Sequence, residues 1–384
     1  MRWFGPHDPV SLQYIRMAGA TGVVTSLHDI DDGRVWETAD IQRRKDLIES
    51  TGLRWVAVES LTPHDDIKLR TGEYQRYLDN YCQTLRNLGR CDIRTVCYNF
   101  MPLLDWTRTN LFRPFHDGSL GLAFNWKDLA VFDIYIAKRK DAEKDYVHLF
   151  PDGLDDYFKS LGKSEIESIG RNILKGLPGT GQSWTIEDFA RLSQRFGEIS
   201  ADRLLENLAE FLKAVVPVAE DANVRMAIHP DDPPYSLFGV PRIAGSEVQL
   251  RRILDVIDSP SNGFTLCTGS YGVNPANDLP GMVRRNGDRM HFIHLRNIIR
   301  DEAGNFYESD HLDGDVDMRQ VVIEIMRVMK KRNESIPMRP DHGHLMMFEM
   351  ENGESIYPGY SLLGRMRGLA ELRGLELGLR SEVF

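Results

Sequence analysis

The chain has 384 residues, of which 42% are hydrophobic, 27% are charged and 9% are aromatic. This composition is typical of a globular protein with a sizeable core, and it excludes a fibrous or intrinsically disordered chain. The formal net charge of −10 argues against broad binding to nucleic acid or to anionic membranes, so we expect neither as a partner.

The first residues, MRWFGPHDPVSLQY, contain no basic stretch leading into an apolar run, and no run of about 18 apolar residues occurs elsewhere. We therefore expect a cytoplasmic protein. Four cysteines, at positions 82, 91, 97 and 267, are too few for a disulfide framework in so long a chain. A reducing compartment leaves a thiolate free to bind metal.

Eight short β-rich runs recur along the chain, and each is followed by a segment with helical periodicity. The β-rich runs cover residues 2–5, 22–27, 53–59, 93–99, 225–229, 263–268, 290–295 and 336–341. The helical segments cover residues 11–20, 39–50, 72–89, 201–221, 246–258, 277–287, 316–333 and 361–374. The seventh helix is predicted to start just after Asp315, a plausible N-cap. The alternation predicts a parallel α/β fold, and its regularity favours a (β/α)8 TIM barrel over an open doubly wound sheet.

Roughly a hundred residues separate the fourth β-rich run from the fifth, far more than a βα connection needs. We interpret residues 105–200, with uncertain bounds, as an insertion with a helical middle and a Gly-rich end, inside a single domain that spans residues 1–384. Because loops after barrel strands lie on the catalytic face, the insertion is expected to act as a lid or as an oligomer contact.

Chemically reactive residues of such barrels come from the carboxyl ends of the strands. The last four predicted strands end at or near His229, Cys267, His294 and Asp341. Two imidazoles, a thiolate and a carboxylate suit Fe²⁺, Mn²⁺, Co²⁺ or Zn²⁺ rather than Mg²⁺ or Ca²⁺. His291 lies three residues before His294 and so points to the opposite face, which predicts a structural role for it. Singly, each candidate ligand has a structural explanation, as a core thiol or a hydrogen-bonded histidine.

Specific segments accompany these residues: HPDDPP after the fifth strand, TLCTGSYG, HFIHLRN, RPDHGH and PGYSLLGRMRG, with the opening WFGP and the pair SLHDI. They resemble the D-mannonate dehydratase family over nearly the whole chain. The resemblance implies a lyase that converts D-mannonate to 2-dehydro-3-deoxy-D-gluconate and water in hexuronate (glucuronate) catabolism. It also implies one Fe²⁺ or Mn²⁺ per subunit and a homo-oligomer with dimer contacts.

The same resemblance assigns the metal ligands to His229, Cys267, His294 and Asp341, and proton transfer to His342 and Tyr360. The stretch MFEMENGESIYPGY is longer than the usual spacing before Pro-Gly-Tyr, so Tyr357 is the neighbour that can be confused with Tyr360. The alternative role of His342 is to orient a metal ligand, and that of Tyr360 is to pack at a loop corner.

Further polar residues near the strand ends suit a polyhydroxylated anion: His28, Glu59 and Asn99, with Arg296 and Asn297 just beyond His294. Arg296 is the preferred partner of the substrate carboxylate because its planar fork fits that group, and the alternative is an exposed ion pair. His311 and Asp313 are expected to line the same pocket or to serve as turn and cap residues.

Two other functions compete with the dehydratase. Metal-bearing barrels include sugar isomerases and epimerases, whose sites rely more on carboxylates and histidines than on a cysteine ligand. A non-catalytic protein would bind the sugar acid without forming a 2-keto acid. An assay of D-mannonate against ketoses separates the first alternative, and detection of the keto acid separates the second.

Overall fold

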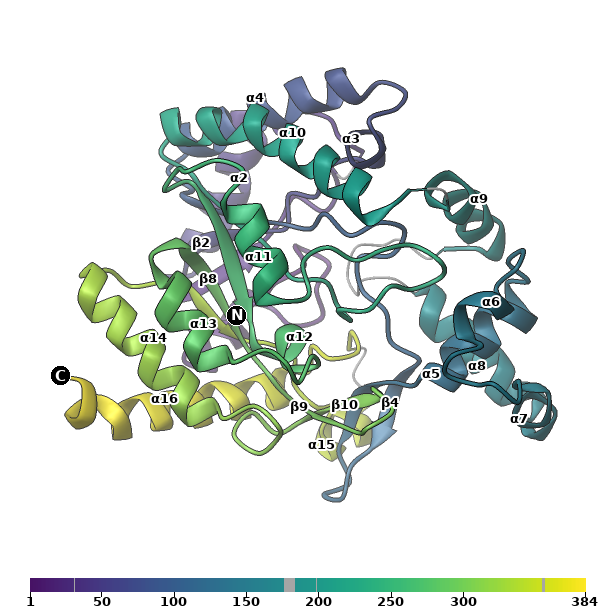
Figure 1. The fold of residues 1–384 in the computed structure, drawn as a ribbon. Helices are drawn as coiled ribbons and strands as arrows, with labels where there is room; N and C mark the ends of the chain where they lie inside the picture. The colour runs from purple at the N-terminus through teal and green to yellow at the C-terminus, as the bar shows by residue number, and fades with distance from the viewer. Residues whose placement is uncertain (31, 176–183, 198, 354–355) are drawn as a thin grey trace.

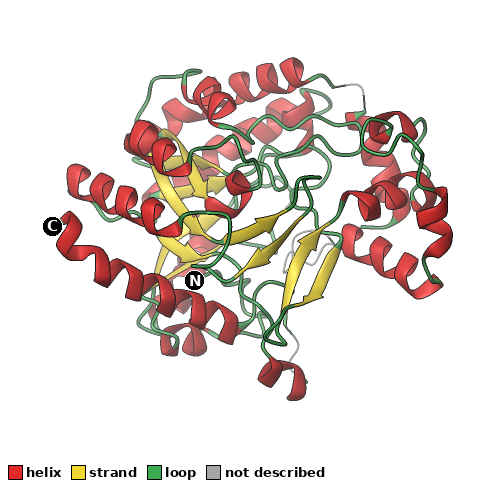
Figure 2. Ribbon diagram, turned by 60° about the horizontal axis from the view of Figure 1, so that its bottom comes forward, coloured by secondary structure: helices red, strands yellow, loops and turns green. Residues whose placement is uncertain are grey.

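A curled sheet of seven parallel strands forms the centre of the protein, in the order β1-β2-β3-β6-β7-β8-β11 (Figures 1 and 2). The computed structural model describes residues 1–30, 32–175, 184–197, 199–353 and 356–384. The strands are almost entirely buried, as parallel strands covered by helices must be. Their bounds are Gly22–Thr25 (β1), Arg54–Glu59 (β2), Thr95–Tyr98 (β3), Arg225–Ile228 (β6), Asn262–Cys267 (β7), Met290–Leu295 (β8) and Met338–Pro340 (β11).

Helices cover the outside of this sheet (Figure 1). Side-chain caps start several of them; for example, the Ser200 hydroxyl accepts from the Arg203 N–H at the start of α10. No helix among the described residues is long and apolar enough to cross a membrane. The bounds are Leu12–Met17 (α1), Thr38–Glu49 (α2), Asp65–Leu69 (α3), Tyr74–Arg90 (α4), Ala201–Asp221 (α10), Glu247–Leu254 (α11), Thr268–Gly272 (α12), Leu279–Asn286 (α13), Gly287–Arg289 (η2), Met318–Arg332 (α14), Met347–Glu351 (α15) and Leu362–Val383 (α16).

The predicted parallel α/β fold is confirmed, with two corrections to its elements. Residues 2–5 do not form a strand; only Arg2 pairs, in a parallel bridge to Val24, because Gly5 turns into the left-handed region and Pro6 has no N–H to donate. Asp315 is not the N-cap of the seventh predicted helix. That cap is Asp317, which accepts from the Gln320 N–H at 3.0 Å.

A second sheet of four antiparallel strands lies beside the parallel sheet, in the order β4-β5-β10-β9 (Figure 2). The sequence analysis did not predict it. Two hairpins build it, and their turns contain Asp117-Gly118 and Gly304, with both glycines in the left-handed region that such turns require. The bounds are Asn110–Pro114 (β4), Leu120–Phe124 (β5), Asn297–Arg300 (β9) and Phe306–Ser309 (β10).

A group of short helices occupies part of the chain between β5 and α10, on the right of Figure 1. It packs around a second apolar cluster, which includes Phe132 and Phe189 of the group and Phe238 from the chain after β6. The helical content agrees with the predicted helical middle of residues 105–200, whereas the predicted Gly-rich end at 176–183 lies outside the described residues. The bounds are Trp126–Val131 (α5), Phe132–Ile136 (η1), Glu143–Tyr146 (α6), Asp155–Ser160 (α7), Lys163–Leu174 (α8) and Ile186–Phe196 (α9).

A small apolar layer fills the inside of the curled sheet and supports the site above it. Five strands contribute one buried residue each to this layer, and Thr265 of β7 contacts it at 3.4 Å from the Cys97 sulfur. Because side chains alternate along a strand, the residue two positions further on faces the same way, one layer nearer the carboxyl end. The five residues are Val24, Ala57, Cys97, Ala227 and Phe292.

Phe292→Ala tests this layer, because Phe292 is fully buried and its ring centroid lies 4.5 Å from that of His294. We expect the free energy of unfolding to fall by about 3–5 kcal/mol, since the deletion leaves a cavity. Chemical denaturation followed by circular dichroism measures it. The control Phe112→Ala removes an exposed ring and should change stability by no more than about 0.5 kcal/mol. Equal stabilities of the two variants would contradict the packing described.

Candidate metal centre and active site

Three predicted ligands meet at the carboxyl ends of β6, β7 and β8. The ligating atoms of His229, Cys267 and His294 all lie within 4.8 Å of one another, and we call these residues the ligand triad. Cys267 and His294 are fully buried. Burial lowers the pKa of His229, which keeps its ring neutral, as a metal ligand must be.

The neighbours of the two imidazoles indicate where their lone pairs point. His229 Nδ1 lies 2.7 Å from the Pro230 carbonyl oxygen, which only accepts, so Nδ1 carries the proton and Nε2 has the lone pair. His294 Nε2 lies 3.5 Å from Glu59 Oε2 and makes no hydrogen bond to a described residue. His229 Nε2, with its lone pair, faces His294 Nδ1 at 3.1 Å.

Either a proton on His294 Nδ1 or a cation between the two nitrogens accounts for this contact. Nitrogens bound to one ion at about 2.1 Å lie roughly 3.0–3.4 Å apart for bond angles between a right angle and a tetrahedral angle. The observed separation falls in this range. The thiol of Cys267 completes the triad, and its sulfur accepts a hydrogen bond from the Ser270 hydroxyl at 3.1 Å.

Asp341, the fourth predicted ligand, lies next to the triad but does not belong to the mutually close group. Its Oδ2 is 3.6 Å from the Cys267 sulfur and 3.3 Å from Arg296 Nη1, and its Oδ1 pairs with Arg339. Burial would raise the pKa of Asp341, but the positive charge of Arg339, followed by His342 and Arg296, lowers it well below its usual range. Asp341 is thus an ionised carboxylate at the edge of the triad.

Glu59 occupies the other side of the triad. Arg339 donates to it from Nε at 2.8 Å and from Nη2 at 2.7 Å, and Arg2 donates from Nη1 at 3.0 Å. Burial would raise the pKa of Glu59, and Arg339 and Arg2 lower it well below its usual range. With both oxygens occupied, Glu59 is suited to orienting His294 rather than to contacting a substrate.

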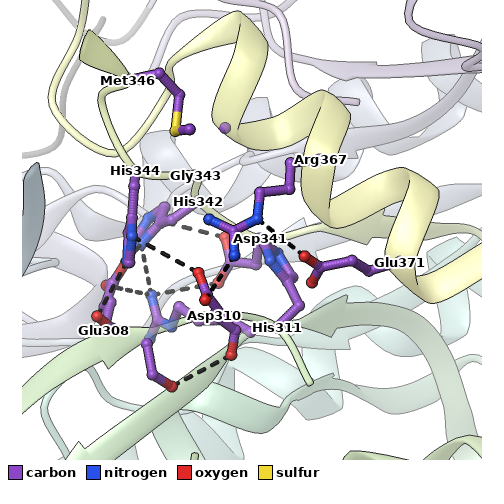
Figure 3. A pocket seen from close by; sticks show the side chains of 13 residues that line it. Glu308, Asp310, His311, Asp341, His342, Gly343, His344, Met346, Arg367 and Glu371 are labelled. Atoms are coloured by element: carbon purple, nitrogen blue, oxygen red, sulfur yellow. Dashed lines mark hydrogen bonds and ion pairs between the residues drawn. The ribbon is translucent and has the colours of Figure 1, made fainter. Parts of the chain in front are cut away.

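His342 directly follows Asp341 and has a φ of 59°, in the left-handed region that a non-glycine residue seldom adopts. Its Nδ1 lies 2.7 and 2.8 Å from the two oxygens of Glu308, and 2.9 Å from Arg296 Nη1 (Figure 3). Tyr360 packs edge-on against it, with ring centroids 5.1 Å apart. The two predicted proton-transfer residues therefore lie together beside the triad.

Tyr360, and not Tyr357, is the tyrosine of this site. Tyr360 is 2% exposed, and its hydroxyl lies 3.4 Å from Arg2 Nη1. Tyr357 is only half-buried and packs against Phe4, with ring centroids 5.2 Å apart. A parallel bridge between Gly343 and Tyr360 fixes this arrangement.

Arg296 lies in a buried network instead of at the surface. It is 2% exposed, so the alternative of an exposed ion pair is wrong. Its Nη2 donates to Asp232 at 2.8 Å, and its Nη1 lies 3.3 Å from Glu308. Arg108 donates to Asp232 at 2.8 Å and pairs with Glu308 at 3.2 Å. Arg296 thus already has several carboxylate partners, which leaves little capacity for a substrate carboxylate.

Two of the other predicted substrate contacts, Asn297 and Asp313, make contacts within the protein instead. The Asn297 side chain is fully used, because its oxygen accepts from the Ile298 and Val316 N–H groups and its amide donates to the Val316 and His311 carbonyls. Asp313 is exposed in a turn, where its N–H donates to the Asp310 carbonyl at 3.2 Å. These positions fit the turn role that the sequence analysis gave as an alternative for Asp313.

The remaining three predicted contacts lie near cavities or strand ends. His28 lines a cavity of about 400 Å³, and burial, followed by the charges of Arg2 and Arg44, lowers its pKa to about 3, so it is neutral. Asn99 is buried just after β3. His311 lines the small pocket of Figure 3 with Asp341 and His342, and burial lowers its pKa to about 4.

The 400 Å³ cavity opens beyond the carboxyl ends of β1 and β2 and is within the size range of small-molecule sites. Polar residues line much of it, among them Ser26, Ser60 and Lys68. Arg2 connects the cavity to the site, since it lines the wall and donates to Glu59, the partner of His294. A small polar molecule in this cavity would therefore be connected to the triad through two side chains, Arg2 and Glu59.

Several charged residues around the ligands were not predicted from the sequence. Arg339 stands two positions before Asp341, so strand alternation alone could have put both on the inner face. Asp232 was part of the quoted HPDDPP segment, although no role was given to it. Glu308 and Arg108 had no such signal, because the small antiparallel sheet that brings Glu308 to the site was not predicted.

Comparison with known proteins identifies the family. The family model described as D-mannonate dehydratase (UxuA) matches residues 1–384. The chain belongs to the D-mannonate dehydratase family. A mannonate dehydratase of Marinomonas sp. (strain MWYL1) is 49% identical over 386 residues, which cover 99% of this chain and 98% of that protein. One of Saccharophagus degradans is 45% identical over 380 residues, which cover 97% and 96%. The predicted resemblance is confirmed.

Solved structures agree with this membership of the D-mannonate dehydratase family. The crystal structure of mannonate dehydratase from Streptococcus suis serotype 2 matches with a TM-score of 0.80 at 33% identity, over 100% of this chain and 95% of that chain. A xylose isomerase domain protein from Alicyclobacillus acidocaldarius matches with a TM-score of 0.50 at 11% identity, over 96% and 93%. The second likeness concerns the fold alone.

Cys267→Ser tests the triad directly. We expect the variant to keep its fold but to lose most of the metal that the wild type binds, because a hydroxyl is a far poorer ligand than a thiolate for transition metals. Metal analysis of anaerobically purified protein measures this. Cys82→Ser, on helix α4, is the matched control and should bind as much metal as the wild type. Normal metal content in Cys267→Ser would remove the thiolate from the site.

Proposed function

We propose that this protein is a D-mannonate dehydratase, a hydro-lyase that converts D-mannonate to 2-dehydro-3-deoxy-D-gluconate and water. The observation that carries the proposal is the position of His342 and Tyr360 beside the ligand triad, in a chain that matches this family throughout its length. The proposal includes a role in hexuronate (glucuronate) catabolism in the cytoplasm.

The triad would hold one divalent ion, Fe²⁺ or Mn²⁺, with Asp341 as the fourth ligand. Support comes from the donor set, because two imidazoles, a thiolate and a carboxylate suit first-row transition metals better than Mg²⁺ or Ca²⁺. His229 Nε2 and His294 Nδ1 lie 3.1 Å apart, a separation that fits two nitrogens bound to one ion. Such an ion supplies positive charge that neutralises the charge developing on the substrate carboxylate when the neighbouring proton leaves.

Two bonds break in the dehydration: C2–H and C3–O. In our proposal a base takes the C2 proton, an acid donates a proton to the departing C3 oxygen, and one water leaves. The enol that remains tautomerises to the 2-keto acid. Tyr360 suits the acid role. Burial raises the pKa of its phenol, and the charges of Arg2 and Arg339 only partly oppose this rise. The phenol therefore keeps its proton until the leaving oxygen takes it.

We propose the substrate-binding residues from where they lie relative to the cavities and the strand ends. His28 and Asn99 remain candidates for the hydroxyl groups, and His311 for the side near Asp341, since each lies in or beside a cavity or strand end. Arg2 joins them, because it lines the larger cavity and its Nε has no hydrogen-bond partner among the described residues. Arg296, Glu59, Asn297 and Asp313 are better explained by structural contacts.

We also propose that residues 1–384 form one TIM-barrel domain, in which the single bridge between Arg2 and Val24 stands in place of an eighth strand. Support comes from Arg2, beside edge strand β1, and Arg339, on the opposite edge strand β11, because both donate to Glu59 and so tie the two edges together. Residues 105–200 would be an insertion that acts as a lid or as a dimer contact in a homo-oligomer.

A keto-acid assay tests the function. Metal-loaded wild type should form a 2-keto acid from D-mannonate, whereas His342→Asn should keep its metal and lose about 10²–10⁴-fold in kcat, the usual contribution of an acid–base residue. His148→Asn, at an exposed position, is the control.

Other outcomes separate the alternatives. Interconversion of ketoses without keto acid would favour an isomerase or epimerase, and D-mannonate binding without any product would favour a binding protein. An unimpaired rate in His342→Asn would refute the role of that residue.

A further inference from the structure

We propose that Glu308 is a positioning residue that holds His342 as the Nδ1–H tautomer, so that Nε2 keeps the lone pair and His342 acts as the base. The inference rests on the proposed dehydratase function and deepens it, because it names the atom that takes the C2 proton. Tyr360 is then left as the acid.

The first support is the geometry of the contact. Both oxygens of Glu308 lie close to His342 Nδ1, at 2.7 and 2.8 Å, and an ionised carboxylate can only accept. Glu308 is 3% exposed. Burial would raise its pKa, but His342, Arg296 and Arg108 lower it, so the carboxylate is ionised. A proton on Nδ1 is the arrangement that satisfies these contacts.

Arg296 offers the competing arrangement, because its Nη1 lies 2.9 Å from the same nitrogen and would donate to a lone pair there. That tautomer would turn the lone pair of His342 Nδ1 toward the two Glu308 oxygens, which lie closer to it than Arg296 Nη1 does. Arg296 Nη1 also has other acceptors, since Glu308 and Asp341 each lie 3.3 Å away. The Nδ1–H tautomer leaves each of these groups with a partner, so we favour it.

The second support is the way in which the chain brings Glu308 to the site. Glu308 lies on β10, in the small antiparallel sheet and not on the parallel sheet that carries the triad. His344 Nε2 lies 3.1 Å from the Glu308 carbonyl oxygen, and the other ring nitrogen lies 3.1 Å from the Ser119 hydroxyl. The His344 side chain thus connects the segments at Ser119 and Glu308, which are far apart in the sequence, and fixes the position of Glu308.

The third support is chemical. When Nε2 takes the C2 proton, His342 becomes an imidazolium, and its positive charge then lies against the carboxylate of Glu308. A carboxylate in this position orients a catalytic imidazole and stabilises the cation that forms, as in the serine protease triad. No further co-reactant is needed, because the leaving hydroxyl takes its proton from Tyr360.

The test is nitrogen-15 NMR of the histidine rings in Zn²⁺-loaded protein, where the His342 signal is assigned by its loss in His342→Asn. Wild type should show a proton-bearing Nδ1 and a bare Nε2. Glu308→Gln should shift this pattern toward protonated Nε2, because the amide can donate to Nδ1. Glu302→Gln, at an exposed position in the turn between β9 and β10, is the control and should keep the wild-type pattern.

Kinetics provide the second measurement. Glu308→Gln should lower kcat for D-mannonate by about 10–100-fold with KM within roughly twofold and with normal metal content, as expected for a residue that orients another. Glu308→Asp should recover part of the loss. A wild-type His342 with Nε2 protonated, or with both nitrogens protonated, would overturn the proposal, as would an unchanged tautomer in Glu308→Gln. The NMR result does not depend on turnover, so a wild type that makes no keto acid would refute the proposed function alone.

Discussion

The alternation of side chains along parallel β-strands is the constraint on which this site depends. Below the triad lies a layer of small or apolar side chains, and each ligand stands two positions beyond a member of that layer or its neighbour Thr265. Phe292 is the largest side chain of the layer, and its ring packs against that of His294. The corresponding pairs are Ala227 and His229, Thr265 and Cys267, and Phe292 and His294.

The site also depends on the balance between the buried positive and negative charges around it. Four buried arginines and four buried carboxylates surround the ligands, and every carboxylate pairs with at least one arginine. Removing one member of a buried pair costs about 3–5 kcal/mol, because the other charge is left without compensation. The network therefore fixes the ionisation of Glu59, Asp341 and Glu308, and through them the orientation of His294 and His342. The members are Arg2, Arg108, Arg296 and Arg339 with Glu59, Asp232, Glu308 and Asp341.

The sequence predicted the part of the site that follows strand periodicity. His229, Cys267 and His294 end neighbouring strands, so their convergence follows from the fold class alone, and motif resemblance added His342 and Tyr360. Contacts that arise between distant segments were not predictable in this way. Glu308 reaches His342 across a hairpin pairing that leaves no long periodic signal, and the burial of Arg296 depends on three carboxylates from separate segments. The first β-rich run, residues 2–5, was overpredicted as a strand, because Gly5 and Pro6 end it after one bridge.

The central claim is that one ion binds a sulfur and two imidazole nitrogens at the end of the parallel sheet. Titration of the metal-free protein with Co²⁺, followed by absorption spectroscopy, tests it most directly, because a cobalt–thiolate bond has an intense near-ultraviolet charge-transfer band that nitrogen and oxygen ligands lack. We expect this band to grow to saturation at one Co²⁺ per chain. Saturable binding of Co²⁺ without the band would show that the ion is held elsewhere or without the sulfur, and would refute the proposed site.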